Sequence, residues 1–458
     1  MKVIILGAGQ VGYNIARYLA TEENDITIVD RSPELLRKIG DTLDVQPVAG
    51  FASHPDVLQQ AGAAEADLMI AVTASDEVNI VACEVANSLF DIGTKIARIR
   101  KQNYLDPHWS GMFARHHLAI DFIISPEVEV ARAISRSIQI GGVFEVISLL
   151  SGHVKVVGVR CGNSSPILNT PLRLLPGLFP KLDLAIVCVS SGNDVSIPSG
   201  EHELHVGDEV YFAVSDTQLE QAIEAFGLVG EKTRRVLIMG GGHIGLTLAG
   251  EIEKSYPDIT TKIIELDPKR AEFVARQLTR TEVLCGDVLD LDVLSEASVQ
   301  NTEAMVAVTD DDKVNILSSL LSKRLGASRA LTLLNNMSYS SLVTSLGVDA
   351  VISPQSITVS TILQYIRQGR LRSAYSLRDG AVEILEAEAR ENSHIIGLSI
   401  EDINIKGSLM VAAVSRDNDV RVAPPKTTIR VGDRLVLITS KAAIKKAEKL
   451  FAPRPSYL

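Results

Sequence analysis

Residues 2–20 read KVIILGAGQVGYNIARYLA: a short apolar run, a glycine-rich turn and an amphipathic segment. The Val, Ile and Leu run is typical of a buried strand, and the apolar spacing after the turn is typical of a helix. Gly7, Gly9 and Gly12 have the spacing of a dinucleotide-binding turn. The first glycine permits the turn, the second lets the backbone approach a pyrophosphate, and the third lets helix and strand pack closely. The stretch therefore predicts a strand–turn–helix unit whose helix N-terminus faces phosphate groups.

A near copy of this stretch follows at residues 235–253, RVLIMGGGHIGLTLAGEIE. Other motifs recur in the same order: AVTASDEVN from residue 71 and AVTDDDKVN from 307, DFIISPE from 121 and DAVISPQ from 349, VGDEVYF from 206 and VGDRLVL from 431. Because the order is kept and the spacing changes little, the pattern indicates an internal duplication.

Each copy divides into two parts. In the first part, Ile- and Val-rich runs alternate with helical patterns, which predicts a doubly wound parallel sheet. In the second part, short strands alternate with turn signals such as Asn193-Asp194 and Asn418-Asp419, which predict hairpins. The expected fold class is α/β, with two tandem copies of a Rossmann-like lobe followed by a small, hairpin-rich α+β lobe. The expected boundaries are 1–139, 140–230, 233–371 and 372–458, with a polar linker at 230–235.

Several helix starts are marked in the sequence. Ser32-Pro33 and Asp267-Pro268 each combine an N-cap residue with a proline at the first helical position. Another helix is expected from Asp76. The acidic run 310–312 suggests either a cation site or an N-cap with first-turn acids, and the cap is the simpler interpretation.

An acid follows each glycine turn at the end of the next strand. Asp30 ends DITIVD, and Glu265 lies near the end of KIIELD. A carboxylate there accepts hydrogen bonds from ribose hydroxyls and repels a 2′-phosphate, which favours NAD(H) over NADP(H). Arg31 is a counter-signal, because a nearby arginine accommodates a 2′-phosphate. ATP or ADP satisfies the same turn and acid. In the second copy, His243 replaces Gln10 and is expected to reshape the site.

Further candidates lie at other strand ends, where ligands of doubly wound sheets bind. Thr73 and Thr309 end matching strands and are placed to contact a cofactor, or they are simply β-branched strand termini. A run of basic residues, Arg98 to Lys101, ends the next strand. Either Arg98 or Arg100 is expected to contact a phosphate or ribose, or the run is simply a solvated loop. The second copy reads LTLLNN here and lacks this charge.

Composition excludes several classes of function. The net charge of -11 argues against nucleic acid as the main partner, because phosphate binding needs clustered Lys and Arg. The four cysteines are scattered in apolar surroundings and predict reduced core thiols in a cytosolic protein, with no metal site. No signal peptide and no membrane-spanning run is evident, so any membrane association is expected to go through a partner.

The histidines of the small lobes (His153, His202, His205 and His394) are not matched between the copies, and no catalytic constellation recurs. An enzyme function is therefore not predicted. Nucleotide sensing, in which the ligand shifts a conformational equilibrium, is the favoured interpretation. An NAD-dependent oxidoreductase with an unidentified substrate is the first alternative. An assembly protein with vestigial sites is the second.

The combination of GAGQVG, GFASHPDVL, AVTASDEVNIVA, IARIR, IISPE and VGDEVYF, repeated through the whole chain, closely resembles the TrkA family. These proteins are cytosolic regulatory subunits of bacterial Trk potassium-uptake systems. The resemblance implies two RCK units, NAD(H) binding with ATP and ADP as further ligands, and a homotetrameric ring at the inner face of the membrane beneath a Trk-type channel subunit. It also implies two sets of nucleotide-binding residues. The first set is Gly7, Ala8, Gly9, Gln10, Val11, Asp30, Thr73, Ala74 and Arg98. The second set is Gly240, Gly241, Gly242, His243, Ile244, Glu265 and Thr309.

Overall fold

The computed structural model describes the chain except for residues 21–23, 106, 114–117, 140, 193, 229–232, 367–372, 378–379, 418, 423–425 and 453–458. The chain divides into two compact units. The first unit comprises Met1–Val130 with Ser353–Tyr365, and the second comprises Ala131–Ile352 with Ile366–Leu458. Among the described residues, none of the helices combines the length and the apolar character that a membrane span requires.

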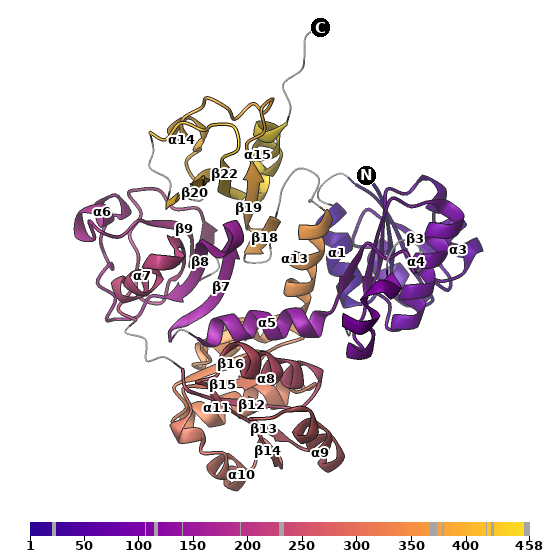
Figure 1. Ribbon diagram of the computed structural model, residues 1–458, viewed down its shortest axis with the longest axis horizontal. Coiled ribbons are helices and arrows are strands. Elements are labelled where there is room, and N and C mark those ends of the chain that lie inside the picture. The colour runs from indigo at the N-terminus through magenta and orange to yellow at the C-terminus, as the bar shows by residue number, and fades with distance from the viewer. Residues whose placement is uncertain are drawn as a thin grey trace. The chain divides into compact units, whose positions relative to one another are not determined.

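The first unit is built on a six-stranded sheet in the order β3-β2-β1-β4-β5-β6, with every neighbouring pair parallel. Figure 1 shows helices α1, α3 and α4 flanking this sheet. The order reverses between β1 and β4, the point where doubly wound sheets bind ligands. The central strands are buried on both faces, as their Ile- and Val-rich runs predict. Its strands are β1 Lys2–Leu6, β2 Asp25–Asp30, β3 Gln46–Ala49, β4 Leu68–Ala71, β5 Thr94–Arg98 and β6 Phe122–Ile124.

Helices connect these strands, and their caps confirm the predicted starts. The Ser32 side chain accepts the Leu35 N–H at 3.4 Å, and Ser75 accepts the Val78 N–H at 3.3 Å. Both bonds satisfy donors that a helix start leaves free. The connecting helices are α1 Gln10–Ala20, α2 Pro33–Gly40, α3 Pro55–Gln60 and α4 Asp76–Phe90, and α5 Pro126–Ile138 follows the last strand.

Helix α13, Pro354–Ile366, comes from the second copy but packs in the first unit. The Gln355 side chain donates to the Gln10 side-chain oxygen at 2.5 Å and accepts from Asn14 at 2.9 Å. The Phe122 and Tyr365 rings stack with centroids 4.4 Å apart. The repeat pattern does not predict this exchange, because it assigns each segment to its own copy.

The second unit contains a sheet of identical design, in the order β14-β13-β12-β15-β16-β17. Asp267 caps α9 by accepting the Arg270 N–H at 2.7 Å, and Asp311 caps α11 by accepting the Lys313 N–H at 2.7 Å. Both caps were expected from the sequence. The elements are β12 Arg235–Met239, α8 His243–Ser255, β13 Thr260–Glu265, α9 Pro268–Gln277, β14 Glu282–Cys285, α10 Leu291–Glu296, β15 Ala304–Ala307, α11 Asp312–Leu325, β16 Arg329–Leu333, α12 Ser340–Ser345 and β17 Ala350–Ile352.

The second unit also holds two antiparallel five-stranded sheets, ordered β10-β9-β11-β8-β7 and β18-β19-β22-β20-β21. Read from opposite ends, the two orders are the same, so the duplication extends to the small lobes. The predicted hairpins β9–β10 and β20–β21 are present, although their turn residues Asn193 and Asn418 lie outside the described residues, as do residues 230–232 of the expected linker. The strands are β7 Val143–Leu149, β8 Val154–Arg160, β9 Leu184–Ser191, β10 Asp194–Ser196, β11 Glu209–Ser215, β18 Ser373–Leu377, β19 Val382–Glu388, β20 Leu409–Arg416, β21 Asp419–Val422 and β22 Arg434–Ser440, and the helices are α6 Leu175–Leu178, α7 Leu219–Ala225, α14 Ile400–Ile403 and α15 Ile444–Phe451.

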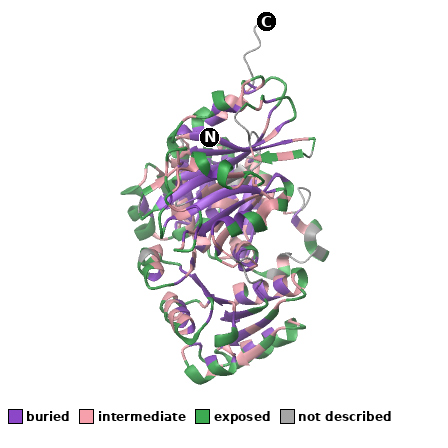
Figure 2. Ribbon diagram, turned by 90° about the vertical axis from the view of Figure 1, so that its left-hand side faces the viewer, coloured by how far each residue is buried: buried purple, intermediate pink, exposed green. Residues whose placement is uncertain are grey.

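The two small lobes share one hydrophobic cluster, which we call the joint core. It combines residues of β7, β8, β9 and β11 with residues of β18, β19, β20 and β22. Figure 2 shows many buried strand segments, drawn in purple, in the middle of the view. A hydrogen bond also joins the two small lobes: the Leu150 N–H donates to the Glu386 side chain at 3.0 Å. The small lobes therefore fold against each other rather than as separate bodies.

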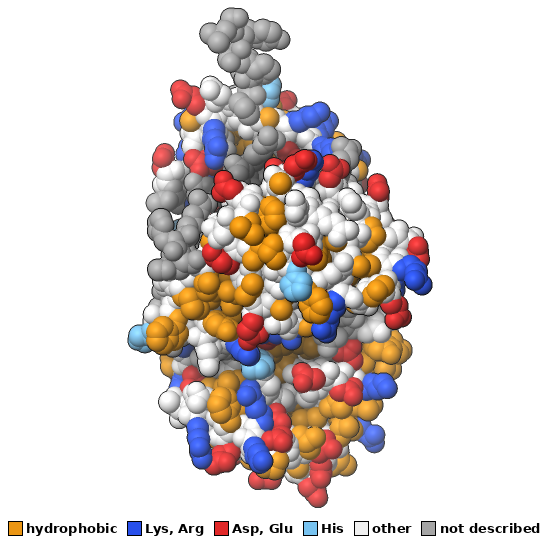
Figure 3. Space-filling model, turned by 90° about the vertical axis from the view of Figure 1, so that its right-hand side faces the viewer, with side chains coloured by type: hydrophobic (Ala, Val, Ile, Leu, Met, Phe, Trp, Pro, Cys, Tyr) orange, Lys and Arg blue, Asp and Glu red, His pale blue; other side chains and the backbone are white. Residues whose placement is uncertain are grey.

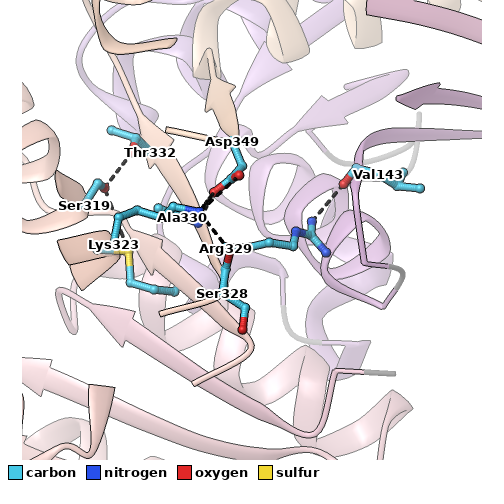
Figure 4. A network of polar contacts seen from close by, with 9 residues as sticks. Val143, Ser319, Lys323, Ser328, Arg329, Ala330, Thr332 and Asp349 are labelled. Atoms are coloured by element: carbon cyan, nitrogen blue, oxygen red, sulfur yellow. Dashed lines mark hydrogen bonds and ion pairs between the residues drawn. The ribbon is translucent and has the colours of Figure 1, made fainter. Parts of the chain in front are cut away.

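Arg329 of β16 joins α5 and β7 to the second parallel sheet, and Figure 4 shows its bond to Val143 of β7. Its guanidinium donates to the Ser137 carbonyl at 3.1 Å and to the Val143 carbonyl at 2.8 Å. The pKa of Arg329 lies below its usual value because burial disfavours the charged form, and nearby Asp349 opposes this effect. The last carbonyl groups of a helix have no N–H partner within the helix. Arg329 therefore supplies a hydrogen-bond donor to one of these carbonyls at the end of α5.

Candidate functional site

The first glycine site consists of Gly7–Gly12 together with Asp30. Gly7 has φ 109°, a conformation that side chains disfavour, and a Cβ on Gly12 would lie 1.8 Å from the Gly7 carbonyl oxygen. These two glycines are therefore required by the turn and by the contact between helix and strand. A Cβ on Gly9 would meet no atom within 4 Å. The fold does not need a glycine at this position, so the open space beside it is available to a ligand.

The Asp30 carboxylate is held against the turn. One oxygen accepts the Ala8 N–H at 2.7 Å, and the other accepts the Ser32 N–H at 2.8 Å. Each carboxylate oxygen keeps acceptor capacity for a further donor. The acid is therefore oriented at the carboxyl end of β2, where a ribose hydroxyl is expected.

Thr73 lies at the carboxyl end of β4, and its neighbour Ala74 is exposed. The Thr73 N–H and hydroxyl both donate to the Asn79 side-chain oxygen, at 2.9 Å and 2.7 Å. Arg98 donates to the Thr73 carbonyl at 2.7 Å. The structure thus brings together Thr73 and Arg98, which the sequence places on separate strands.

The Arg98 guanidinium is mostly buried, and burial together with the nearby charge of Arg100 lowers its pKa to about 10. Within the described part of the chain, its Nε is a buried donor that has no hydrogen-bond partner. A buried donor without an acceptor is costly, which is compatible with a ligand supplying the acceptor.

Asp76 and Asn79 are residues that the sequence reasoning missed as parts of the site. Asn79 is fully buried and also donates to the Arg98 carbonyl at 2.9 Å. Asp76 accepts the N–H groups of Arg100 and Lys101 at 3.0 Å and 2.9 Å. Together they tie the ends of β4 and β5 to the start of α4. The repeated pattern VTxxDxVN carries the signal, since it keeps both side chains at fixed spacing in each copy.

The second glycine site, Gly240–Gly245 with Glu265, repeats this design. Gly240 has φ 104°, a Cβ on Gly245 would lie 1.9 Å from the Gly240 carbonyl, and a Cβ on Gly242 would meet no atom within 4 Å. The Glu265 carboxylate accepts the Gly241 N–H at 2.6 Å and the Asp267 N–H at 2.9 Å.

The second site differs from the first in its charged side chains. His243 is exposed and Ile244 is half-buried at the start of α8. Thr309 donates to the Asn315 side chain at 2.7 Å, as Thr73 does to Asn79. Leu333 takes the place of Arg98, as the pattern LTLLNN predicts, while Arg270 donates to the Gly241 carbonyl at 2.7 Å. The arginine of the first site therefore ends β5, whereas that of the second site lies in the first turn of α9.

The cysteines require one correction. Cys83, Cys161 and Cys188 are buried, and burial raises the pKa of Cys83 to about 12. Cys285 is exposed, so the prediction of a core thiol is wrong there, because β14 is an edge strand and Cys285 ends it. In the described ranges, no group of three or more His, Cys, Asp or Glu residues is arranged to hold a metal ion.

Charged side chains of both signs are interspersed on the face that Figure 3 shows, with several apolar patches between them. A protein that tracks nucleic acid instead needs a continuous basic surface. On this face, the basic side chains do not form a continuous surface.

Comparison with known proteins gives the family. The TrkA-N domain model matches residues 3–126 and 236–354, and the TrkA-C domain model matches residues 384–452. The Trk system potassium uptake protein TrkA of Azorhizobium caulinodans is 44% identical over 451 residues, covering 98% of each chain. The protein of the same name from Halomonas elongata is 38% identical over 455 residues, again covering 98% of each chain.

Among solved structures, the GsuK channel has a TM-score of 0.63 at 18% identity, over 98% of this chain and 78% of that one. The GsuK RCK domain has a TM-score of 0.61 at 18% identity, over 99% of this chain and 95% of that one. These likenesses agree with the tandem fold. The curated relatives and the matched domain models show that the chain belongs to the TrkA family of Trk system potassium uptake proteins.

Proposed function

We propose that this chain is a nucleotide-sensing regulatory subunit of a potassium-uptake system. It binds NAD(H), ATP or ADP at its two glycine sites and controls a Trk-type membrane subunit through a change of conformation. The observation that carries the proposal is the matched pair of sites, each with an oriented acid and an open position at its second glycine. In support, the relative GsuK channel has been solved bound to NAD and bound to ADP.

The proposed organisation follows the family. The Rossmann-like lobes span 1–139 and 233–371, and the small lobes span 140–230 and 372–458. The chain assembles as a homotetrameric ring that associates with the inner face of the cell membrane through the channel subunit. The ligand acts by binding one conformation more tightly than another, since a ligand shifts an equilibrium only through such a difference.

Each proposed nucleotide site uses its own set of residues. The turns Gly7–Val11 and Gly240–Ile244 hold the phosphates, and Asp30 and Glu265 hold ribose hydroxyls. The ligand of the first site also contacts Thr73 and Ala74, which follow β4, and the ligand of the second site contacts Thr309, which follows β15. Arg98 adds a cation in the first site only.

We further propose that the chain is not an enzyme. A dehydrogenase needs an acid or base beside the nicotinamide, and the histidines of the small lobes have no matched arrangement. The curated relatives are named as potassium uptake proteins, which supports the same view.

Two glycine variants test the proposal. Gly9→Val and Gly242→Val each place a side chain in open space, so the fold is expected to stay intact. Each single variant should lose nucleotide binding at its own site and keep binding at the other, and the double variant should lose both. Equilibrium dialysis with NADH and ADP measures this, with thermal unfolding as the check on folding. Unchanged affinity in a correctly folded double variant would contradict the proposal.

The alternatives give different results. Consumption of NADH in the presence of carbonyl substrates, followed by nicotinamide absorbance, would support an oxidoreductase. Failure of the unaltered chain to bind any adenine nucleotide would support an assembly protein. A pull-down of the Trk membrane subunit with and without nucleotide tests regulation directly, and the double variant should lose the nucleotide dependence.

A further inference from the structure

Strand order predicts where the base of a nucleotide lies at the first glycine site. The turn after β1 faces the phosphates and Asp30 ends β2, next in the order β3-β2-β1. In a nucleotide the base is attached at C1′ of the ribose and the phosphate is carried through C5′ on C4′, so the two project from different ends of the sugar ring. With phosphates at β1 and ribose hydroxyls at β2, the base extends toward the carboxyl end of β3. The Gly50 N–H donates to the Asp30 carbonyl at 2.9 Å, so the residue that follows Gly50 lies beside the acid.

That residue is Phe51, whose side chain is 54% exposed. Its ring stacks on the His54 ring, with centroids 5.1 Å apart and an angle of 25° between the planes. A large ring left half exposed and braced by a second ring is suited to bind another flat, aromatic group.

His54 occupies the N-cap position of α3 but makes no capping bond with its side chain. This position normally takes Ser, Thr, Asp or Asn, whose side chains satisfy a free N–H of the helix. The chain therefore gives up a local bond here and gains the ring contact with Phe51. Local departures of this kind are typical of functional sites.

The second copy shows that the fold does not need the aromatic pair. Asp287 and Asp290 take the places of Phe51 and His54 there. Asp290 caps α10 by accepting the Asp292 N–H at 2.8 Å, and Asp287 accepts the Leu289 N–H at 2.9 Å. The same corner of the same fold is thus built from ordinary turn and cap residues.

We propose that the Phe51 ring, braced by His54, is the surface on which the purine base of the nucleotide stacks at the first glycine site. This inference rests on the proposed function, because it names the part of that site that reads the base. The second glycine site lacks the surface, so the two sites differ in their preference for a purine.

The experiment uses the full chain carrying Gly242→Val, so that only the first site reports, with ADP and UDP as probes. Phe51→Ala should weaken ADP binding by roughly tenfold or more and UDP binding less, since a purine offers the larger stacking surface. Phe51→Trp should preserve ADP binding. His54→Asp should raise thermal stability by restoring the cap while weakening ADP binding, a combination that a purely structural role would not give.

Asp287→Ala in the same background is the matched control and should leave ADP affinity unchanged. If the Phe51→Ala variant binds ADP as tightly as before and the Gly9→Val variant no longer binds ADP, the stacking proposal is wrong and the proposed function stands. If Gly9→Val also binds ADP normally, the first glycine site does not hold the nucleotide, and both ideas fail. An equal loss of ADP and UDP in Phe51→Ala would likewise overturn base recognition by the ring.

Discussion

At the scale of single residues, the first and last glycines of a turn are required for different physical reasons. Gly7 adopts a backbone conformation that side chains disfavour, and Gly12 lies too close to the Gly7 carbonyl for any Cβ. The residue after the first glycine differs between the copies, Ala8 in one and Gly241 in the other. A Cβ on Gly241 would lie 3.0 Å from the Glu265 carboxylate, so the longer acid is matched with the smaller residue.

This pairing predicts a coupled effect of two substitutions. Gly241→Ala alone should crowd Glu265 and lower the free energy of unfolding by about 1 kcal/mol. Adding Glu265→Asp recreates the pair Ala8 and Asp30 and should recover most of that loss. Urea unfolding of the single and double variants measures the coupling. Strictly additive effects would show that the two positions do not share the space.

At the scale of elements, the sheets depend on polar side chains that close the ends of helices and strands. Arg329 supplies donors to α5 and β7 from the first residue of β16. Asn79 and Asn315 each join a strand end to the following helix in their own copy. Buried groups of this kind are costly to remove, because their partners then stay in the interior without a hydrogen bond.

Arg329→Met should therefore destabilise the chain by about 2–3 kcal/mol, since the carbonyls of Ser137 and Val143 lose their donor. Arg324→Met is the matched control, because Arg324 is exposed near the end of α11 and should change stability by less than about 0.5 kcal/mol. Thermal and urea unfolding measure both. Similar effects in the two variants would argue against the bonds to α5 and β7.

Glu383 in β19 predicts a pH dependence of stability. Burial, together with the negative charge of Glu448, raises its pKa to about 8 from an ordinary 4.5, while Lys441 opposes the rise. Between pH 4.5 and about pH 8, the Glu383 carboxyl group is therefore protonated in the folded chain and ionised in the unfolded chain. Stability from this group is full below about pH 4.5 and falls as the pH rises toward 8.

The decline is at most about 1.4 kcal/mol per pH unit for a single group. Glu383→Gln keeps the shape and removes the titration, so its free energy of unfolding should fall less steeply between pH 5 and about pH 8. Urea unfolding at several pH values tests this. Parallel pH profiles for the two proteins would show that Glu383 does not titrate in this range.

At the scale of the whole molecule, the duplication is present at every level, but the repeats do not fold independently. Helix α13 of the second copy packs in the unit of the first parallel sheet. The small lobes meet in the joint core. Elements far apart in the sequence therefore share hydrophobic cores. We expect a substitution in the joint core of one small lobe to lower the stability of the other small lobe as well.

Val436→Ala tests this sharing, because Val436 in β22 is fully buried in the joint core. The cavity should cost about 2 kcal/mol and increase hydrogen exchange in β8 of the other small lobe as well as in β22. Val210→Ala is the control, since Val210 is equally buried but belongs to a cluster confined to the first small lobe. An effect of Val436→Ala restricted to its own lobe would contradict a common core.

By itself, the sequence determined the parts whose signals are local. The glycine spacing, the strand-end acids, the caps at Ser32 and Asp267 and the order of the repeated motifs predict the strands, the helices and both glycine sites, because each depends on residues that are close together in the chain. Only the tertiary structure decided what depends on distant partners. Arg98 bonds to the Thr73 carbonyl because β4 and β5 are neighbours, and Gln355 bonds to Gln10 because α13 packs in the first unit. Gly50, the neighbour of Phe51, bonds to Asp30 because β3 adjoins β2. Burial and contact at these places come from the order of the strands in the sheet, which no short stretch of sequence contains.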